Sequence, residues 1–468
     1  MIHSMEYDVC FIGAGPGGYV GAIKAANLGL KVALIEKEKV GGTCLIRGCI
    51  PTKTLISNVD VVRVIKHAKE FGVTVDHFSI DYQKMKERKD QVVAGLCRGV
   101  TGLVKSHGIA LIEGTASFES PHKIRVKNGD QVSLVEFENG VIATGSTSMN
   151  ISAAVVDGKR IHDSTSILEL THLPKSLVVL GGGYIGCEFA SLFSELGVKV
   201  TIVEFLPDIV FSMGKTISQF LTKSFQKRGV EIRTGVKLIN SEVKGDHVRS
   251  FLDDGSTIDS DMLLVAVGRA PYTEGLNLSA IGLGVDKRGF IEVNDSMETE
   301  VKGIYAVGDV TGKSMLAHVA SHQAIIAAER IAGFAARINY DNVPAVMFTH
   351  PEIATVGLTL ERARDRKLDV RSDLFPFSAL GKAQASRETE GFAEIITEKK
   401  SGRIVGAFMV GFEAGNMIAS MTLAIQNELT IESISETIFA HPTLAESWME
   451  AALIAQDTPI HLPPLKKK

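Results

Sequence analysis

The hydrophobic pattern of the chain begins with an apolar run, residues 7–12, that leads directly into a glycine-rich segment, residues 13–18. A stretch with helical periodicity follows to Asn27, and a second apolar run ends at Glu36. Short apolar runs bounded by glycine are typical of buried parallel strands. The pattern therefore predicts a strand, a tight turn, a helix and a second strand in that order.

The same succession of hydrophobic and polar positions returns 168 residues later. An apolar run, residues 177–180, leads into the glycine-rich segment 181–186, and a helical stretch runs to Leu196. The following strand ends at Glu204, which corresponds to Glu36 at the same offset. An internal repeat of this kind predicts two copies of one structural unit, each with a parallel sheet and a helix after its first strand.

Both glycine-rich segments have the spacing GxGxxG. A single copy is weak evidence because glycine is common, but here each copy follows a strand and opens a helix. Each is also followed, 18 positions after its third glycine, by a glutamate.

In a dinucleotide site the first glycine allows the turn, the second admits the pyrophosphate and the third lets helix and strand pack closely. The phosphates then meet the free N–H groups of the helix N-terminus. The alternative, two turns without a ligand, does not explain the full context. The predicted contacts are Gly13, Gly15, Gly18, Gly181, Gly183 and Gly186.

The two strand-end glutamates indicate which nucleotides are bound. A carboxylate at this position accepts hydrogen bonds from ribose hydroxyls and repels a 2′-phosphate. After Glu204 the segment 205–210 contains no arginine or lysine that could hold such a phosphate. The sequence therefore favours NAD over NADP at the second site, although Glu204 could also be a plain surface carboxylate.

The remaining pattern completes the predicted fold class. Apolar residues at helical spacing over 92–104 predict an amphipathic helix that packs on the core, and strand-like runs fill 109–148 and 230–270. After about residue 345, strands alternate with a helix over about 413–427. We predict an α/β protein with two Rossmann-like dinucleotide-binding domains and an α+β C-terminal domain.

Composition and charge exclude several other classes of protein. The 468 residues predict two to four domains at about 150 residues each. A net charge of −4 gives no reason to expect nucleic acid or an anionic membrane as a partner. No apolar run approaches the roughly 18 residues of a membrane span. The first residues lack the basic and apolar regions of a signal peptide, and we therefore expect a cytoplasmic protein.

Two of the five cysteines, Cys44 and Cys49, have C-x4-C spacing and are the candidates for chemistry. A structural zinc site needs about four ligands, and no second cysteine pair is present, so we expect no metal. A buried structural thiol pair remains open. A redox pair fits better, because the segment begins eight residues after Glu36 and so lies close to the first dinucleotide. The other cysteines are predicted to be small apolar residues of the core: Cys10, Cys97 and Cys187.

With these motifs in place, the chain resembles the pyridine nucleotide-disulfide oxidoreductases and, within them, the dihydrolipoyl dehydrogenase group. The resemblance covers nearly the whole sequence and is most specific in the cysteine block and in the block that begins at His441. The matching blocks are 13–18, 41–53, 143–146, 181–188, 266–271, 303–309, 315–318, 348–351 and 441–446.

The resemblance implies a different role for each residue of the catalytic centre. Cys44 exchanges disulfides with the substrate, and Cys49 lies against the flavin and passes electrons to it. His441 is the acid/base, oriented by Glu446. A histidine titrates near neutral pH and raises the fraction of substrate thiolate. Two further catalytic residues are implied, and they pair with each other: Lys53 and Glu188.

The resemblance also implies the cofactor contacts. The FAD contacts are Gly13, Gly15, Gly18, Glu36, Lys53, Gly114, Thr144, Gly145, Ser146, Asp309, Met315, Leu316, Ala317 and His318. The NAD contacts are Gly181, Gly183, Gly186, Glu188, Glu204, Val236 and Gly268.

The resemblance further implies a domain plan, an assembly and a cellular role. FAD is bound by residues 1–148 and 271–345, NAD by 149–270, and residues 346–468 form a dimerisation domain. The protein is expected to be a homodimer in which His441 serves the partner subunit's cysteines. Its expected partners are the lipoyl domains and acyltransferase core of 2-oxoacid dehydrogenase complexes, and its expected role includes cell redox homeostasis.

Three positions depart from the commonest pattern of this group: Ile46 stands where asparagine is usual, Thr52 where serine is usual, and Tyr184 where an aliphatic residue is usual. Tyr184 resembles the tyrosine over the flavin in glutathione reductase, so a glutathione-reductase-like enzyme is the alternative. The lack of basic residues after Glu204 argues against it. No cysteine follows Cys187, which excludes a second, C-terminal thiol pair.

Overall fold

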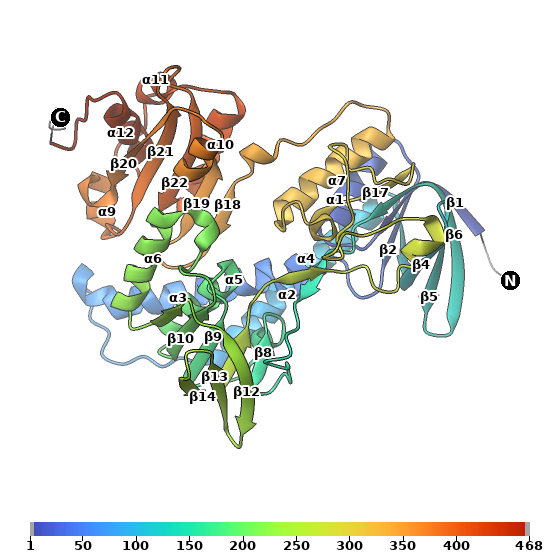
Figure 1. Cartoon of the computed structure of the whole chain (residues 1–468), viewed down its shortest axis with the longest axis horizontal. Helices are drawn as coiled ribbons and strands as arrows, with labels where there is room; N and C mark the ends of the chain where they lie inside the picture. The colour runs from blue at the N-terminus through green and yellow to red at the C-terminus, as the bar shows by residue number, and fades with distance from the viewer. Residues whose placement is uncertain (1–3, 464–468) are drawn as a thin grey trace. The chain divides into compact units, whose positions relative to one another are not determined.

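The computed structural model describes residues 4–463 and divides into two compact units (Figure 1). Unit 1 comprises the chain up to Ile151 together with residues 155–173 and 268–338. Unit 2 comprises residues 152–154 and 174–267 and the chain from Asn339 onward.

Unit 1 is built on a mixed sheet whose parallel part has the order β3-β2-β1-β6, with β17 parallel to the end of β6. The first half of β6 pairs antiparallel with β5, which pairs with β4. The strands are β1 (Ser4–Ile12), β2 (Val32–Glu36), β3 (Ala110–Glu113), β4 (Thr115–Ser120), β5 (Lys123–Asn128), β6 (Gln131–Ile142) and β17 (Ile304–Ala306). The short strands are β7 (Ser146–Ser148), β8 (Ile161–Asp163) and β16 (Arg269–Pro271), of which β7 and β16 pair antiparallel.

The alternation of β1 divides the core of unit 1 between the two faces of the sheet. Val9 and Phe11 pack in one cluster with residues of α1 and α7, whereas Cys10 and Ile12 pack in another with Phe118 of the antiparallel part. The helices of unit 1 are α1 (Pro16–Asn27), α2 (Gly42–Arg47), α3 (Cys49–His67), α4 (Tyr82–Ser106) and α7 (Ala317–Ile331).

The predicted amphipathic helix is present as part of α4, but the expectation that its apolar side packs on the core is only half right. Cys97 and Val104 are buried, whereas Leu96 and Leu103 are 42% and 51% exposed. The reason is that α4 packs mainly on α3, with smaller contacts to α1, α2 and β3, so part of its apolar stripe faces away from the core.

Unit 2 contains a second parallel sheet with the strand order β11-β10-β9-β15, which matches β3-β2-β1-β6 of unit 1. This agreement confirms the internal repeat. Its elements are β9 (Ser176–Leu180), α5 (Tyr184–Glu195), β10 (Lys199–Glu204), α6 (Lys215–Lys227), β11 (Glu231–Thr234) and β15 (Met262–Val265). An antiparallel sheet of β12 (Leu238–Lys244), β13 (His247–Leu252) and β14 (Thr257–Ser260) is inserted before β15.

The C-terminal part of unit 2 is an antiparallel sheet of order β18-β19-β22-β21-β20 packed against helices. Trp448 of α12 is completely buried at the centre of its hydrophobic core. The strands are β18 (Ala345–Met347), β19 (Ile353–Gly357), β20 (Val370–Pro376), β21 (Phe392–Glu398) and β22 (Ile404–Val410). The helices are α8 (Leu360–Asp365), α9 (Gly381–Ser386), α10 (Ala414–Gln426), α11 (Ile431–Ser435) and α12 (Glu446–Ala455). The predicted fold class is confirmed.

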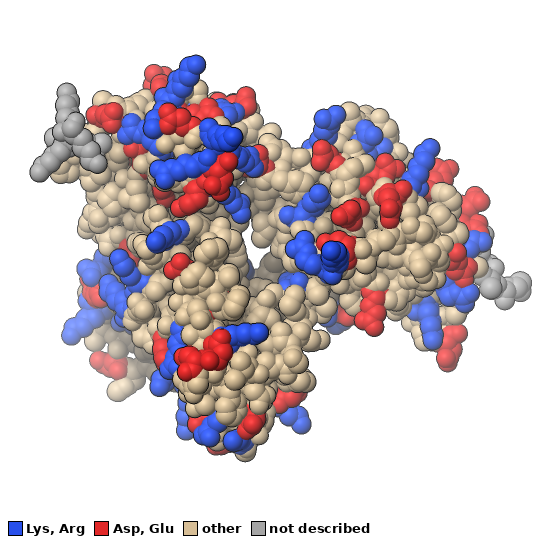
Figure 2. All heavy atoms as spheres, viewed as in Figure 1, with Lys and Arg blue, Asp and Glu red and all other residues tan. Residues whose placement is uncertain are grey.

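The surface carries both signs of charge. Figure 2 shows lysine and arginine interspersed with aspartate and glutamate over the visible face. Among residues 4–463, no helix combines the length and the hydropathy that a membrane crossing requires.

Candidate active site

The first glycine loop, Gly13–Gly18, has the close contacts that the motif predicts. A Cβ atom at Gly13 would lie 2.6 Å from the carbonyl oxygen of Ala143, and one at Gly18 would lie 1.7 Å from the carbonyl oxygen of Gly13. Gly15 precedes α1 and provides no side-chain cap for its N–H groups. The N-terminal end of the helix dipole favours an anion at this position, which suits a phosphate.

The second glycine loop, Gly181–Gly186, repeats this geometry. A Cβ atom at Gly181 would lie 2.4 Å from the oxygen of Ala266, and one at Gly186 would lie 1.9 Å from the oxygen of Gly181. Around Gly183 no heavy atom lies within 4 Å of the Cβ position, so a ligand can approach the backbone there. These residues fit a dinucleotide in both loops.

The two strand-end glutamates bind their own loops in the same way. Oε2 of Glu36 accepts from the Ala14 N–H at 2.7 Å, and Oε2 of Glu204 accepts from the Gly182 N–H at 2.5 Å. Burial raises the pKa of Glu36, although the Ala14 hydrogen bond opposes this. Each carboxylate oxygen can accept a further hydrogen bond, so ribose hydroxyls remain possible partners.

The cysteine segment is seated directly against the first glycine loop. The Gly41 N–H donates to the carbonyl oxygen of Ala14 at 2.8 Å. A Cβ atom at Gly42 would lie 2.5 Å from the Cα of Gly15, so only glycine permits this contact. The tertiary structure therefore places the start of α2 beside the predicted pyrophosphate position.

The predicted redox pair, Cys44 and Cys49, spans the break between α2 and α3. Both cysteines are in the thiol form and half-buried, and they are hydrogen-bonded to each other. This hydrogen bond and burial raise the pKa of the Cys44 thiol, whereas the charge of Lys53 lowers it. Cys49 is the first residue of α3, where free N–H groups favour negative charge. The arrangement suits a pair that carries one negative charge, on Cys49.

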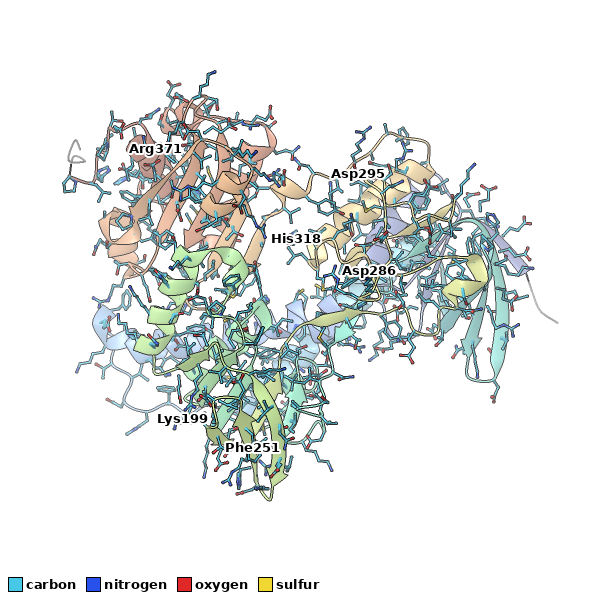
Figure 3. The ribbon with its side chains drawn as sticks, viewed as in Figure 1. Lys199, Phe251, Asp286, Asp295, His318 and Arg371 are labelled. Carbon is cyan, nitrogen blue, oxygen red and sulfur yellow. The ribbon has the colours of Figure 1, made fainter. Side chains whose placement is uncertain are left out.

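The other predicted FAD contacts also lie in unit 1. Gly114 has φ +147° and donates its N–H to the carbonyl oxygen of Glu36 at 2.8 Å. The Thr144 hydroxyl donates to the oxygen of Tyr272 at 2.6 Å. The segment 315–318 leads into α7, and His318 is labelled at the start of that helix in Figure 3.

Ser146 and Asp309 are hydrogen-bonded to each other, and both are met by Arg269. Arg269 has no role predicted from the sequence, although it lies inside a matched block, directly after Gly268.

The predicted NAD contacts lie in unit 2, except Gly268, which begins a segment of unit 1 and accepts the Met149 N–H at 3.1 Å. The Val236 N–H donates to the carbonyl oxygen of Glu204 at 3.2 Å. Glu188 accepts the Phe348 N–H at 2.9 Å through Oε1. The pairing of Glu188 with Lys53 concerns two different units and stays a prediction.

His441 and Glu446 form the predicted pair within unit 2. Nδ1 of His441 lies 2.8 Å from Oε1 of Glu446, and Oε2 accepts the Thr443 N–H at 2.7 Å. Burial favours the neutral acid, but the hydrogen bonds from Thr443 and His441 outweigh it and lower the pKa of Glu446. The ionised carboxylate thereby fixes Nδ1 of an imidazole whose side chain is 77% exposed.

A second histidine, which follows α12 in the chain, is bound in the same manner by a glutamate one turn further along that helix. Nδ1 of His461 lies 2.7 Å from Oε1 of Glu450, and the His461 N–H donates to Oε2 at 3.2 Å. The Glu450 side chain is only 1% exposed. This pair was not predicted from the sequence, because its two members lie eleven residues apart with a turn between them.

We expect His461→Ala to destabilise the protein by about 1–3 kcal/mol, because the buried Glu450 carboxylate loses its ring partner. The measurement is the midpoint of thermal unfolding of the holoenzyme. His67→Ala is the control, since His67 pairs with the exposed Glu70 on the surface of unit 1. Equal midpoints for the two variants would contradict the expectation.

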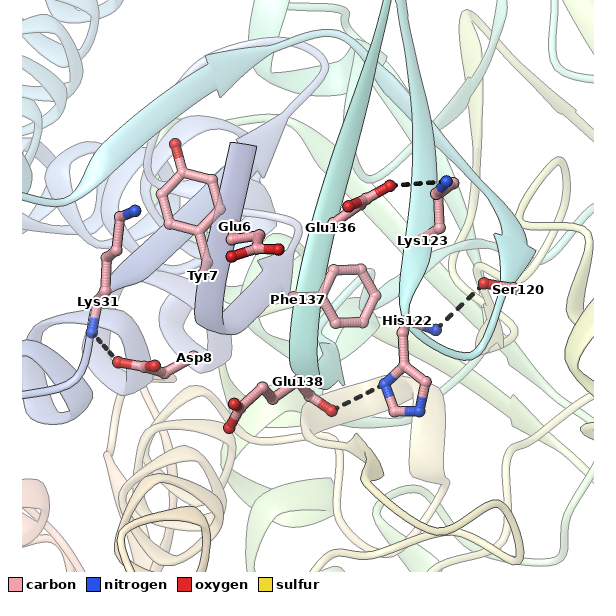
Figure 4. A pocket seen from close by; sticks show the side chains of 10 residues that line it. All are labelled: Glu6, Tyr7, Asp8, Lys31, Ser120, His122, Lys123, Glu136, Phe137 and Glu138. Carbon is pink, nitrogen blue, oxygen red and sulfur yellow. Dashed lines mark hydrogen bonds and ion pairs between the residues drawn. The ribbon is translucent and has the colours of Figure 1, made fainter. Parts of the chain in front are cut away.

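A surface pocket of about 480 Å³ lies at the opposite end of the sheet of unit 1 (Figure 4). Two of its charged residues, Lys123 and Glu136, form an ion pair at 2.6 Å. Ligands of parallel α/β sheets bind beyond the carboxyl ends of the strands. The pocket lies where β1 begins and is therefore separate from the nucleotide site.

Two family models match the chain. Residues 7–324 match the pyridine nucleotide-disulphide oxidoreductase family, and residues 343–452 match the dimerisation domain of that family.

Curated relatives match over almost their whole length. The chain is 46% identical to a dihydrolipoyl dehydrogenase of Chlamydia pneumoniae, covering 98% of this chain and 99% of the relative. It is 42% identical to one from Geobacillus stearothermophilus, with 98% of each covered.

Solved structures with the same fold include LpdA from Mycobacterium tuberculosis, with a TM-score of 0.90 and 28% identity over 95% of this chain and 98% of that one. The flavoprotein disulfide reductase RclA from Escherichia coli has a TM-score of 0.87 and 29% identity, covering 96% and 99%.

Proposed function

Because the chain belongs to the pyridine nucleotide-disulphide oxidoreductase family, we propose that Cys44 and Cys49 are the redox pair of its catalytic centre. Its activity is that of a dihydrolipoyl dehydrogenase, which oxidises dihydrolipoamide to lipoamide and reduces NAD to NADH with FAD as cofactor. The observation that carries the assignment is the contact between the two thiols on a segment seated against the first glycine loop.

The residues of unit 1 hold the cofactor in this proposal. The first glycine loop and the N-terminus of α1 receive the pyrophosphate, and Glu36 receives the ribose. Ser146 and Asp309 lie on the same unit and provide polar contacts. FAD held by these residues would supply the two-electron redox chemistry that links the dithiol to NAD.

The protein's own residues carry the thiol chemistry. His441 takes the proton of one substrate thiol, and the resulting thiolate forms a bond to the Cys44 sulfur of the enzyme disulfide. The Cys44–Cys49 bond breaks, and Cys49 keeps the electron pair as a thiolate. The second substrate thiol, once deprotonated, then displaces Cys44 and closes the lipoamide disulfide.

We further propose that the enzyme is a homodimer in which His441 serves the cysteines of the other subunit. The matched dimerisation region includes both His441 and Glu446. Three positions before this histidine, Ile438 is 97% exposed, and Leu423 of α10 is 64% exposed. Both residues lie within the matched region, so a second subunit bound there would have apolar side chains to cover.

The partners and the location stay predictions. Dihydrolipoamide carried on lipoyl domains is the expected substrate, in association with the acyltransferase core of a 2-oxoacid dehydrogenase complex. The cytoplasmic location predicted from the sequence is also proposed, and the curated relatives include mitochondrial enzymes such as that of Schizosaccharomyces pombe.

Steady-state kinetics with dihydrolipoamide, glutathione disulfide, NAD and NADP side by side test the assignment. We expect NADH formation from dihydrolipoamide with little use of NADP or glutathione disulfide. The alternative, a glutathione-reductase-like enzyme, requires a basic pocket for a 2′-phosphate, and residues 205–210 provide none. A preference for NADPH with glutathione disulfide would overturn the proposal.

Glu204→Ala should raise the KM for NAD by about ten- to a hundredfold, because the ribose loses a charged hydrogen-bond acceptor. The KM for dihydrolipoamide should stay close to that of the wild type. Glu242→Gln, on the exposed strand β12, is the matched control. An unchanged KM for NAD in the Glu204 variant would show that this carboxylate does not bind the ribose.

A further inference from the structure

Lys37 and Tyr272 form a cation–π contact in unit 1 that the function described above does not use. Nζ of Lys37 lies 3.7 Å from the centre of the Tyr272 ring, well inside the roughly 6 Å at which such contacts are significant. By comparison, Nζ of Lys31 lies 5.3 Å from the centre of the Tyr7 ring. Lys37 is exposed and directly follows Glu36, the last residue of β2. The contact is therefore close enough to hold a flexible surface lysine against a half-buried ring.

The backbone of Tyr272 is bound as firmly as its ring. Its N–H donates to the carbonyl oxygen of Gly145 at 3.0 Å, and its own carbonyl oxygen accepts the Thr144 hydroxyl at 2.6 Å. These bonds continue the antiparallel pairing of β16 with β7, in which Pro271 lies opposite Ser146. Tyr272 is thus bound through its backbone to two of the predicted FAD contacts.

The Lys37–Tyr272 contact joins two strand ends that flank the first glycine loop. In the sheet of unit 1, β1 lies between β2 and β6 and is parallel to both, so the three carboxyl ends share one edge. The loop Gly13–Gly18 follows β1. Lys37 follows β2, whereas Thr144 and Gly145 follow β6. The contact therefore connects the segment next to the predicted ribose contact with the segment on the other side of the loop.

We propose that Tyr272 is a positioning residue of the FAD site, which with Lys37 joins the end of β2 to the segment after β6 and so slows the release of bound FAD. A cofactor held at several points leaves when the segments that hold it open locally. Each contact between those segments adds to the free energy of that opening. The inference rests on the proposed function, because it takes the FAD contacts of unit 1 from there.

The rate of FAD release tests the proposal without turnover. The holoenzyme is mixed with an excess of isotopically labelled FAD, and the flavin that stays with the protein is followed by mass spectrometry. Tyr272→Leu removes the ring and Lys37→Met removes the charge. Each should speed the exchange by about three- to tenfold, in line with the usual strength of a cation–π contact. An unchanged rate in either variant would overturn the proposal.

The conservative variant Tyr272→Phe distinguishes the contact from general packing. It keeps an aromatic face for Lys37 and should exchange FAD within about twofold of the wild-type rate. Exchange as fast as in Tyr272→Leu would count against the proposal. Lys37→Met covers the case in which Tyr272→Leu does not fold, because it breaks the same contact from the exposed side.

The double variant Lys37→Met/Tyr272→Leu separates the contact from a direct effect of either residue. Two residues that act only through each other are not additive, so the double variant should exchange FAD at the rate of the single ones. A lysine that acted directly on the phosphates of the cofactor would add its own effect. Single effects that multiply in the double variant would therefore contradict the proposal.

Lys31→Met is the matched control in the same unit. It removes a lysine that lies over the Tyr7 ring and lines the pocket at the opposite end of the sheet, and it should exchange FAD at the wild-type rate. An equal acceleration in this control would assign the effect to a general loosening of unit 1 and would refute the role of Tyr272.

Failure of this inference can be distinguished from failure of the proposed function. A holoenzyme that retains FAD but does not oxidise dihydrolipoamide would defeat the proposed function, and its exchange rates would still report on Tyr272. Normal oxidation of dihydrolipoamide with equal exchange rates in all variants would defeat this inference alone.

Discussion

Cys44→Ser is expected to lower the rate of dihydrolipoamide oxidation by at least about a thousandfold, because a hydroxyl cannot form or break the disulfide on which the exchange depends. Cys44 and Cys49 are hydrogen-bonded to each other, and the pair lies on a segment that contacts the first glycine loop. The oxygen of serine fits the same space, so the fold and the bound FAD should persist. The measurement is NADH formation from dihydrolipoamide.

Two comparisons make this prediction specific. Reduction of an artificial quinone by NADH does not require the disulfide and should stay within about twofold of wild type in the Cys44 variant. Cys97→Ser, a change at a buried cysteine of α4 outside the pair, should keep dihydrolipoamide oxidation. Equal rates of dihydrolipoamide oxidation for wild type and Cys44→Ser would remove the redox pair from the mechanism.

His441→Gln is expected to lower kcat for dihydrolipoamide by about 10²- to 10⁴-fold at pH 7, the usual contribution of a general base. Glu446 has a lowered pKa and therefore stays ionised down to acidic pH, so its carboxylate keeps holding Nδ1 of His441 there. The loss should shrink as the pH rises, because the substrate thiols then ionise without a base. The pH dependence of kcat and kcat/KM measures this.

The chain provides a closely matched control for this variant. His461 is bound to Glu450 through Nδ1 as His441 is bound to Glu446, and both glutamates lie on α12. His461→Gln keeps a hydrogen-bond donor for Glu450 and should leave the pH profile of the enzyme unchanged. The same loss of rate in both variants would indicate that the C-terminal fold, and not the base, is what His441→Gln disturbs.

The sequence by itself determined those features of the fold that depend on local pattern. The strand, glycine turn, helix and strand at 7–36 return at 177–204, and both form parallel sheets of the same strand order. The role of the glycines could be predicted from the sequence because these positions exclude any side chain for steric reasons. A Cβ atom at Gly18 or Gly186 would lie less than 2 Å from a carbonyl oxygen. The spacing of the two cysteines was equally readable, because α2 and α3 follow each other directly in the chain.

The sequence predicted local contacts of the candidate site better than it predicted burial, because burial depends on distant parts of the chain. His441 and Glu446 lie five residues apart and meet as expected, at 2.8 Å. The exposure of Leu96 and Leu103 was not predicted, because helical periodicity indicates an apolar face and does not indicate what covers that face.

Only the tertiary structure decided the contacts between distant parts of the chain. Arg269 meets Ser146 across 123 positions of sequence because β16 pairs with β7. Glu188 accepts a hydrogen bond from Phe348 across 160 positions. No local propensity distinguishes these charged residues from surface ones, since their role is set by the groups that the fold brings within a few ångströms. The sequence therefore predicted which residues carry the chemistry, and the tertiary structure decided which charges surround them.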